Sequence, residues 1–167
     1  MIKISVCDDD EGQLTFFKQC FMEYNEKHKE KIEANFYQSV QSLLNEKKFS
    51  PDVYFLDIEL QDGNGLKLAG KIRTRNSKIP IVFITSHEEF MPEAFHVHAY
   101  QYLNEKKNAQ AVENVLNQLA DYFSEQNQIF SFQTYGEMIS LDCRDIICFT
   151  SEKRKNIVIA ESGEFEY

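Results

Sequence analysis

The chain has 167 residues, of which 43% are hydrophobic and 27% are charged. This composition excludes a disordered tail or a fibrous protein, and the length allows one domain of about 100–150 residues with part of a second. With 18 Lys and Arg against 27 Asp and Glu, the net charge is −9, which disfavours non-specific binding to nucleic acid or to anionic membranes.

From residue 2 onward the sequence alternates short apolar strands with amphipathic helices. Val53–Leu56 and Ile81–Ile84 are continuous apolar runs, as expected of central strands that helices cover on both faces. Five successive strand-helix units predict an α/β fold with an open, doubly wound parallel sheet. The expected strands are Ile2–Cys7, Ile32–Tyr37, Val53–Leu56, Ile81–Ile84 and 99–103.

Beyond about residue 125 the hydrophobic period changes to two, which is typical of half-exposed strands. Gly136 and Gly163 lie where turns are expected. We therefore expect a first domain over residues 1–125 and a short all-β fragment over 126–167, which is marginal in size for independent folding. The strand-like segments of this fragment are 129–134, 138–141, 146–149 and 156–160.

Acidic and hydroxyl residues follow three strands of the first domain. Asp8 and Asp9 end the first strand, Asp57 ends the third and Thr85 ends the fourth. Because ligands bind beyond the carboxyl ends of parallel strands, three carboxylates meet if the first and third strands are neighbours. Their mutual repulsion would be relieved by Mg²⁺, which prefers carboxylate and water oxygens. With a phosphoryl group present, Thr85 would donate to it and one carboxylate would attack as nucleophile.

A simpler interpretation competes with this site. An Asp after a strand is often a turn or helix-capping residue, and the run Asp8, Asp9 and Asp10 before a helix fits that role. It explains Asp57 poorly, because this residue follows four apolar residues and precedes Ile58.

Three separated motifs, in order, resemble the receiver domain of two-component response regulators. They are Val6-Cys7-Asp8-Asp9-Asp10, the segment 54–69 from Tyr54-Phe55-Leu56-Asp57 to Gly65-Leu66-Lys67-Leu68-Ala69, and Ile81-Val82-Phe83-Ile84-Thr85-Ser86. The resemblance covers about residues 1–125 and implies a flavodoxin-like sheet of five parallel strands in the order 2-1-3-4-5.

The resemblance also implies roles for individual residues. Asp57 would be the phosphoacceptor, and Asp8 and Asp9 would hold Mg²⁺ with Asp57 and the backbone carbonyl of Glu59. Thr85 would be the switch hydroxyl, and Tyr102 the aromatic that changes rotamer with it.

One position departs from the family pattern. Receivers carry a lysine at the end of the fifth strand, where this chain has Glu105 followed by Lys106. Either the strand slips by one residue and the long stem of Lys106 reaches the phosphoryl group, or the site is weakened by a fourth carboxylate. We favour Lys106, and the alternative stays open.

The C-terminal fragment resembles the opening strands of a LytTR-type DNA-binding domain, and the chain would end less than halfway through it. Residues 129–167 hold 4 Lys and Arg and 7 Asp and Glu, a net charge of −3. DNA recognition by this chain alone is therefore doubtful, because contacts with phosphates need cations.

These features predict a phosphorylation switch that takes its phosphoryl group from a sensor histidine kinase. The expected response is a changed surface and homodimerisation, with control of transcription in a complete chain. Such a regulator is not an enzyme beyond its own phosphorylation and dephosphorylation. Two alternatives are a pseudo-receiver that never takes phosphate and a Mg²⁺-dependent phosphatase of the haloacid-dehalogenase kind, using Asp8 and Asp10.

A cytoplasmic location is expected. No apolar run approaches the roughly 18 residues of a membrane span, and residues 1–5 do not resemble a signal peptide, so no membrane partner is expected. The four cysteines form no CxxC pair, and we expect them to be reduced and mostly buried.

Overall fold

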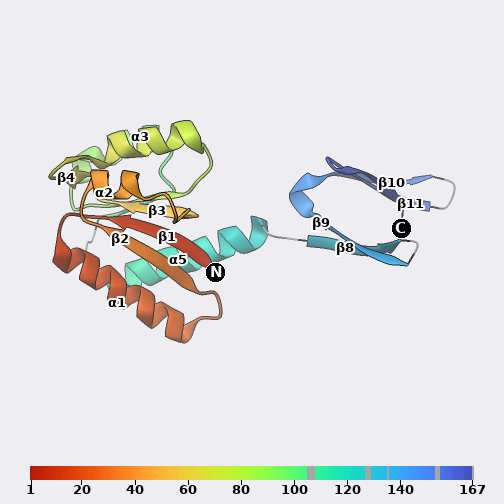
Figure 1. The fold of residues 1–167 in the computed structure, drawn as a ribbon, viewed down its shortest axis with the longest axis horizontal. Coiled ribbons are helices and arrows are strands. Elements are labelled where there is room, and N and C mark those ends of the chain that lie inside the picture. Colours follow the sequence, from red (N-terminus) through yellow and green to blue (C-terminus); the bar gives the residue numbers. More distant parts are fainter. Residues whose placement is uncertain (105–107, 127–128, 135, 153–154, 167) are drawn as a thin grey trace. The chain divides into compact units, whose positions relative to one another are not determined.

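A computed structural model describes residues 1–104, 108–126, 129–134, 136–152 and 155–166. The chain forms two compact units, Met1–Asn117 and Gln118–Tyr167, and Figure 1 shows their elements. Up to residue 126 the elements in chain order are β1 (Ile2–Cys7), α1 (Glu11–Lys27), β2 (Ile32–Tyr37), α2 (Val40–Asn45), β3 (Val53–Leu56), β4 (Glu59–Leu60), β5 (Gly63–Asn64), α3 (Gly65–Arg75), β6 (Ile81–Ile84), η1 (Glu88–Phe90), α4 (Met91–His96), β7 (Gln101–Leu103) and α5 (Ala109–Gln126).

The first unit is built on a parallel sheet of five strands in the order β2-β1-β3-β6-β7. This is the predicted order 2-1-3-4-5, since β6 and β7 are the fourth and fifth strands of the sheet. In Figure 1, α2 and α3 cover one face of the sheet, and α1 lies on the other. Cys7 pairs with Leu56, so the carboxyl ends of β1 and β3 lie side by side.

The central strands are buried because helices cover both faces of the sheet. All four residues of β6 are fully buried, as are Val53, Phe55 and Leu56 of β3. On the α1 side, Phe17 and Phe21 pack edge-on against Phe55, with ring centroids 5.9 and 5.8 Å apart. Burying each of these rings stabilises the fold by about 1.5–3 kcal/mol and fixes β3 in the sheet.

Side-chain caps set where the helices begin. Asp10 accepts hydrogen bonds from the N–H groups of Gly12 and Gln13 at the start of α1. Ser39 caps α2, and Asn64 accepts from the first turn of α3. These caps fix the loops that run between strand ends and helices on the side of the sheet that carries Asp57.

Some elements differ from the sequence-based prediction. The loop after Asp57 contains the short antiparallel pair β4–β5, with Glu59 opposite Asn64. Between β6 and β7 the chain forms only η1 and the short helix α4, and α5 continues to Gln126, just past the division expected near residue 125. Two-residue strands and helix ends depend on local hydrogen bonds that hydrophobic periodicity does not record.

The second unit contains a two-stranded and a three-stranded antiparallel sheet, β8–β9 and β10-β11-β12. Its core is Phe132, Leu141, Val158 and Ala160. Gly136 occupies the expected turn with φ of 90°, whereas Gly163 begins a strand that the sequence did not predict. The elements are β8 (Ile129–Thr134), β9 (Glu137–Asp142), η2 (Cys143–Asp145), β10 (Ile146–Glu152), β11 (Lys155–Ala160) and β12 (Gly163–Glu166).

The cysteines divide between the two units. Cys7 and Cys20 in the first unit are buried, but Cys143 and Cys148 in the second are exposed. The expectation of mostly buried thiols is therefore wrong for the second unit, whose strand β10 is exposed along most of its length. Among the described residues, no helix has the length and apolar character needed to cross a bilayer.

Candidate functional site

Three carboxylates meet at the carboxyl edge of the parallel sheet. Asp8, Asp9 and Asp57 each offer an oxygen that lies within 4.8 Å of the oxygens offered by the other two. Asp8 is 0% exposed and Asp57 is 2% exposed. Residues 49 positions apart in the chain are thus brought together as the strand-end pattern predicted, because β1 and β3 are neighbours.

Backbone hydrogen bonds fix where these carboxylates lie. The N–H of Asp57 donates to the carbonyl of Cys7 (2.8 Å), and the N–H of Asp8 donates to the carbonyl of Tyr37 (3.1 Å). Oδ1 of Asp57 accepts from the N–H of Ile58 at 2.8 Å. Asp9 Oδ2 accepts from the N–H of Gln61 at 3.2 Å, which ties the β1 end to the loop after β3.

Gly65 packs directly against the backbone of Asp57. Its N–H donates to the carbonyl of Ile58 at 2.9 Å. A Cβ at this position would lie 2.0 Å from the carbonyl oxygen of Asp57, which is far inside van der Waals contact. Only glycine therefore lets α3 begin this close to the strand end that carries Asp57.

The carboxylates make this edge of the sheet strongly negative. Burial, together with the negative charges of Asp62, Asp8, Asp57 and Asp9, raises the pKa of the Cys7 thiol to about 12. Two buried carboxylates and a third beside them form an all-oxygen donor set, which suits a hard divalent cation such as Mg²⁺. Asp8, Asp9 and Asp57 are the residues that would hold it.

An open cavity of about 540 Å³ gives access to the carboxylates. Its size and polar lining leave room for a small phosphorylated group next to Asp57. The lining residues are Asp9, Asp57, Glu59, Leu60, Gln61, Gly63, Asn64 and Phe90.

His87 forms a bridge between Glu59, which lines this cavity, and Glu89. Its Nε2 lies 3.0 Å from Oε2 of Glu59, and its Nδ1 lies 3.0 Å from Oε1 of Glu89. The backbone nitrogen of His87 lies 3.4 Å from Oγ1 of the fully buried Thr85. The Tyr102 hydroxyl donates to the His87 carbonyl. His87 therefore connects both predicted switch residues to the loop after Asp57. The sequence gave no signal for the contacts that His87 makes with Glu89 and Tyr102.

Two predicted candidates have other outcomes. Glu105 and Lys106 lie outside the described residues, so the position of the family's lysine stays a prediction that favours Lys106 over Glu105. The Asp10 carboxylate caps α1, accepting from Gly12 at 2.8 Å and from Gln13 at 3.3 Å. This capping role leaves Asp10 poorly placed to be the acid or base of a phosphatase.

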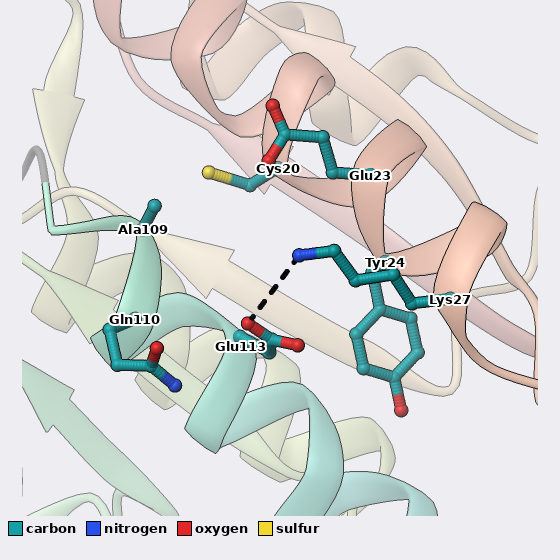
Figure 2. Close-up of a pocket in the computed structure, with 7 residues that line it drawn as sticks. All are labelled: Cys20, Glu23, Tyr24, Lys27, Ala109, Gln110 and Glu113. Atoms are coloured by element: carbon teal, nitrogen blue, oxygen red, sulfur yellow. Dashed lines mark ion pairs between the residues drawn. The ribbon is translucent and has the colours of Figure 1, made fainter.

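A separate cavity of about 180 Å³ lies between α1 and the first turns of α5 (Figure 2). Glu113 on α5 contacts Lys27 Nζ at 4.0 Å and His28 Nε2 at 3.2 Å. Cys20 lines this cavity, and burial raises the pKa of its thiol to about 11. These contacts tie the two helices together, and the high pKa keeps the thiol protonated and unreactive near neutral pH.

Comparison with known families agrees with this geometry. Residues 4–117 match the sequence model of the family described as response regulator receiver domain. The chain belongs to this family. The receiver is 29% identical over 120 residues to an uncharacterized response regulatory protein of Yersinia pestis, covering 72% of this chain and 49% of that protein. It is 32% identical over 111 residues to the sensory transduction protein LytR of Staphylococcus haemolyticus, covering 66% of this chain and 42% of that protein.

Solved receiver structures share the fold at low sequence identity. A CheY-like receiver from Methanospirillum hungatei superposes with a TM-score of 0.65 at 18% identity, covering 76% of this chain and 99% of that one. TrrA of Thermotoga maritima, solved in complex with Mg(2+)-BeF, gives 0.61 at 22% identity, covering 71% and 99%. The chain spans less than half the length of the two curated relatives named above.

Proposed function

We propose that this receiver takes a phosphoryl group on Asp57 from the phosphohistidine of a sensor histidine kinase. The observation that carries the proposal is the meeting of Asp8, Asp9 and the nearly buried Asp57 at the carboxyl edge of the sheet. Asp57 also lines the open cavity, so a donor has access to it.

The chemistry follows from the positions of these side chains. A carboxylate oxygen of Asp57 bonds to phosphorus while the P–N bond to the kinase imidazole breaks, giving an acyl phosphate and a free histidine. Asp8, Asp9 and Asp57, with the backbone carbonyl of Glu59, would hold Mg²⁺, which would neutralise charge on the phosphoryl oxygens. Thr85 would donate its hydroxyl to one phosphoryl oxygen, and Lys106 would contact another.

The output we propose is a surface around α4, β7 and α5 that changes when Thr85 and Tyr102 move. The Tyr102 hydroxyl donates a hydrogen bond to the His87 carbonyl. A shift of Thr85 and of the loop that carries His87 would therefore also move Tyr102. On α4, Met91 is 45% exposed and Phe95 is 80% exposed, and such apolar side chains favour a homodimer contact.

For the second unit we propose a LytTR-type role, with the domains divided near residue 125. Its antiparallel strands support this assignment. DNA binding would belong to a chain with a complete second domain, because residues 129–167 have a net charge of −3.

Acetyl phosphate provides a direct test that needs no kinase. With Mg²⁺ the intact mass of the full chain should rise by one phosphoryl group, and peptide mapping should place this group on Asp57. Chelation of Mg²⁺ with EDTA should suppress the reaction. If the chain gains no phosphoryl group, and if its NMR spectrum does not change when Mg²⁺ and beryllofluoride are added, the chain would instead be a pseudo-receiver.

The bridge at His87 should influence the rate of this reaction. The His87 ring pairs with the carboxylate of Glu59, a residue that lines the cavity, so His87→Asn should let Glu59 turn toward the aspartates and repel anionic acetyl phosphate. Because Glu59 is 57% exposed, we expect only about threefold slower phosphorylation, measured by intact mass against time. Adding Glu59→Gln to the His87→Asn variant should restore the rate. A double variant as slow as the single one would exclude this mechanism.

A further inference from the structure

A groove between α2 and α3 lies apart from the aspartate site. It has a volume of about 380 Å³. Leu43 and Ile72 are buried beneath it, while Leu44 is 36% exposed and Tyr54 is half-buried. The groove thus combines an apolar floor with an aromatic ring. Its lining residues are Leu43, Leu44, Glu46, Tyr54, Lys71, Ile72, Thr74 and Arg75.

Two positively charged side chains line the α3 side of the groove. Lys71 and Arg75 are four residues apart, so they project from the same face of the helix. Within the part of the chain that the structure describes, neither side chain forms an ion pair. Arg73, in contrast, donates to the carbonyls of Val97 (2.9 Å) and His98 (2.8 Å).

Glu46 offsets only one of the two positive charges that line the groove. Glu46 accepts hydrogen bonds from the N–H groups of Lys48 (2.6 Å) and Phe49 (3.3 Å), so its carboxylate is held by the chain after α2. Burial and the nearby Tyr37 raise the pKa of Tyr54, and the positive charge of Arg75, which lines the same groove, opposes that rise. The groove is thus locally cationic on a chain with a net charge of −9.

The dimensions of the groove favour a compact ligand. Lys71 and Arg75 lie about 6 Å apart along the helix axis, whereas a docked partner helix needs anchors spread over about 10 Å. The volume of about 380 Å³ is near the lower end of the range of about 300–1,000 Å³ for small-molecule sites.

We propose that the groove between α2 and α3 binds a small aromatic carboxylate. Its ring lies on Leu44 and Tyr54, and its carboxylate is held by Lys71 and by the planar fork of Arg75. None of these residues lines the cavity at Asp57, so the groove is a separate site.

Titration of the ¹⁵N-labelled full chain with 2-naphthoate tests the proposal by NMR. We expect saturable shift changes confined to the amides of residues 43–46, 54 and 71–75. The K71Q/R75Q double variant should bind at least about tenfold more weakly, since two charge-assisted contacts are lost. The neutral analogue 2-naphthamide should show a similar loss with the unaltered chain.

Lys78→Gln is the matched control, because it removes one positive charge from an exposed residue outside the groove. It should bind 2-naphthoate like the unaltered chain. A second variant, Leu44→Asp, puts a negative charge in the groove at a partly exposed position and should also weaken binding. Circular dichroism checks that each variant is folded.

Three results would overturn the proposal. They are shift changes that do not saturate or that centre on another cavity, equal affinity of the K71Q/R75Q variant, and preference for an acidic peptide whose shift changes extend beyond the groove.

Discussion

Asp57→Asn should abolish phosphoryl incorporation from acetyl phosphate, with a rate at least about 10³-fold below that of the unaltered chain. An amide oxygen is a far weaker nucleophile than a carboxylate, and the exchange also removes one of the three charges that would hold Mg²⁺. The fold should be retained, because Asn can still accept the hydrogen bond that the N–H of Ile58 donates to Asp57 Oδ1. The measurement is intact mass after incubation with acetyl phosphate and Mg²⁺.

Asp52→Asn is the matched control for this experiment. Asp52 lies just before the opposite end of β3, and its carboxylate accepts from the N–H of Lys3 at 2.9 Å, a bond that Asn can also accept. This variant should be phosphorylated at the normal rate. If the Asp57 variant incorporated phosphate as fast as the Asp52 variant, another residue would be the acceptor.

Gly65→Ala should be the most damaging small substitution in the first unit. The added Cβ would lie 2.0 Å from the carbonyl oxygen of Asp57 and 2.9 Å from its carbonyl carbon. Both atoms belong to the backbone, so relief requires α3 and the end of β3 to separate. We expect a loss of about 2–4 kcal/mol in the free energy of unfolding, measured in urea, and slower phosphorylation because Asp57 itself is displaced.

Gly70→Ala provides the comparison within the same helix. A Cβ at Gly70 would meet nothing within 4 Å, and alanine favours a helix interior over glycine by about 0.5–1 kcal/mol. This variant should therefore be slightly more stable than the unaltered chain. Similar losses of stability at Gly65 and Gly70 would contradict the close approach of Gly65 to Asp57.

The sheet order and the meeting of the aspartates were both predictable, for different reasons. The uninterrupted apolar runs of β3 and β6 require burial on both faces, which indicates a parallel sheet with helices on each side. The order of its strands came from the family resemblance. Once β1 and β3 are adjacent, Asp8 and Asp57 must lie close together because each follows the end of its strand.

Contacts between distant side chains were not predictable in this way. The bridge from His87 to Glu59 depends on where the loop after β6 lies relative to β4, and no sequence period encodes that distance. The requirement for glycine at position 65 likewise comes from packing against Asp57. The exposure of Cys148 was missed because the general tendency of cysteine to be buried says nothing about a strand whose residues face solvent.

Because the exposed thiols all belong to the second unit, this unit can be labelled selectively without mutagenesis. Cys7 and Cys20 are buried, with pKa values of about 12 and 11, so a maleimide dye at neutral pH should leave them unmodified. Cys143 and Cys148 are both exposed and both belong to the second unit. A fluorophore on either one would report on the second unit during phosphorylation while leaving the aspartate site chemically untouched.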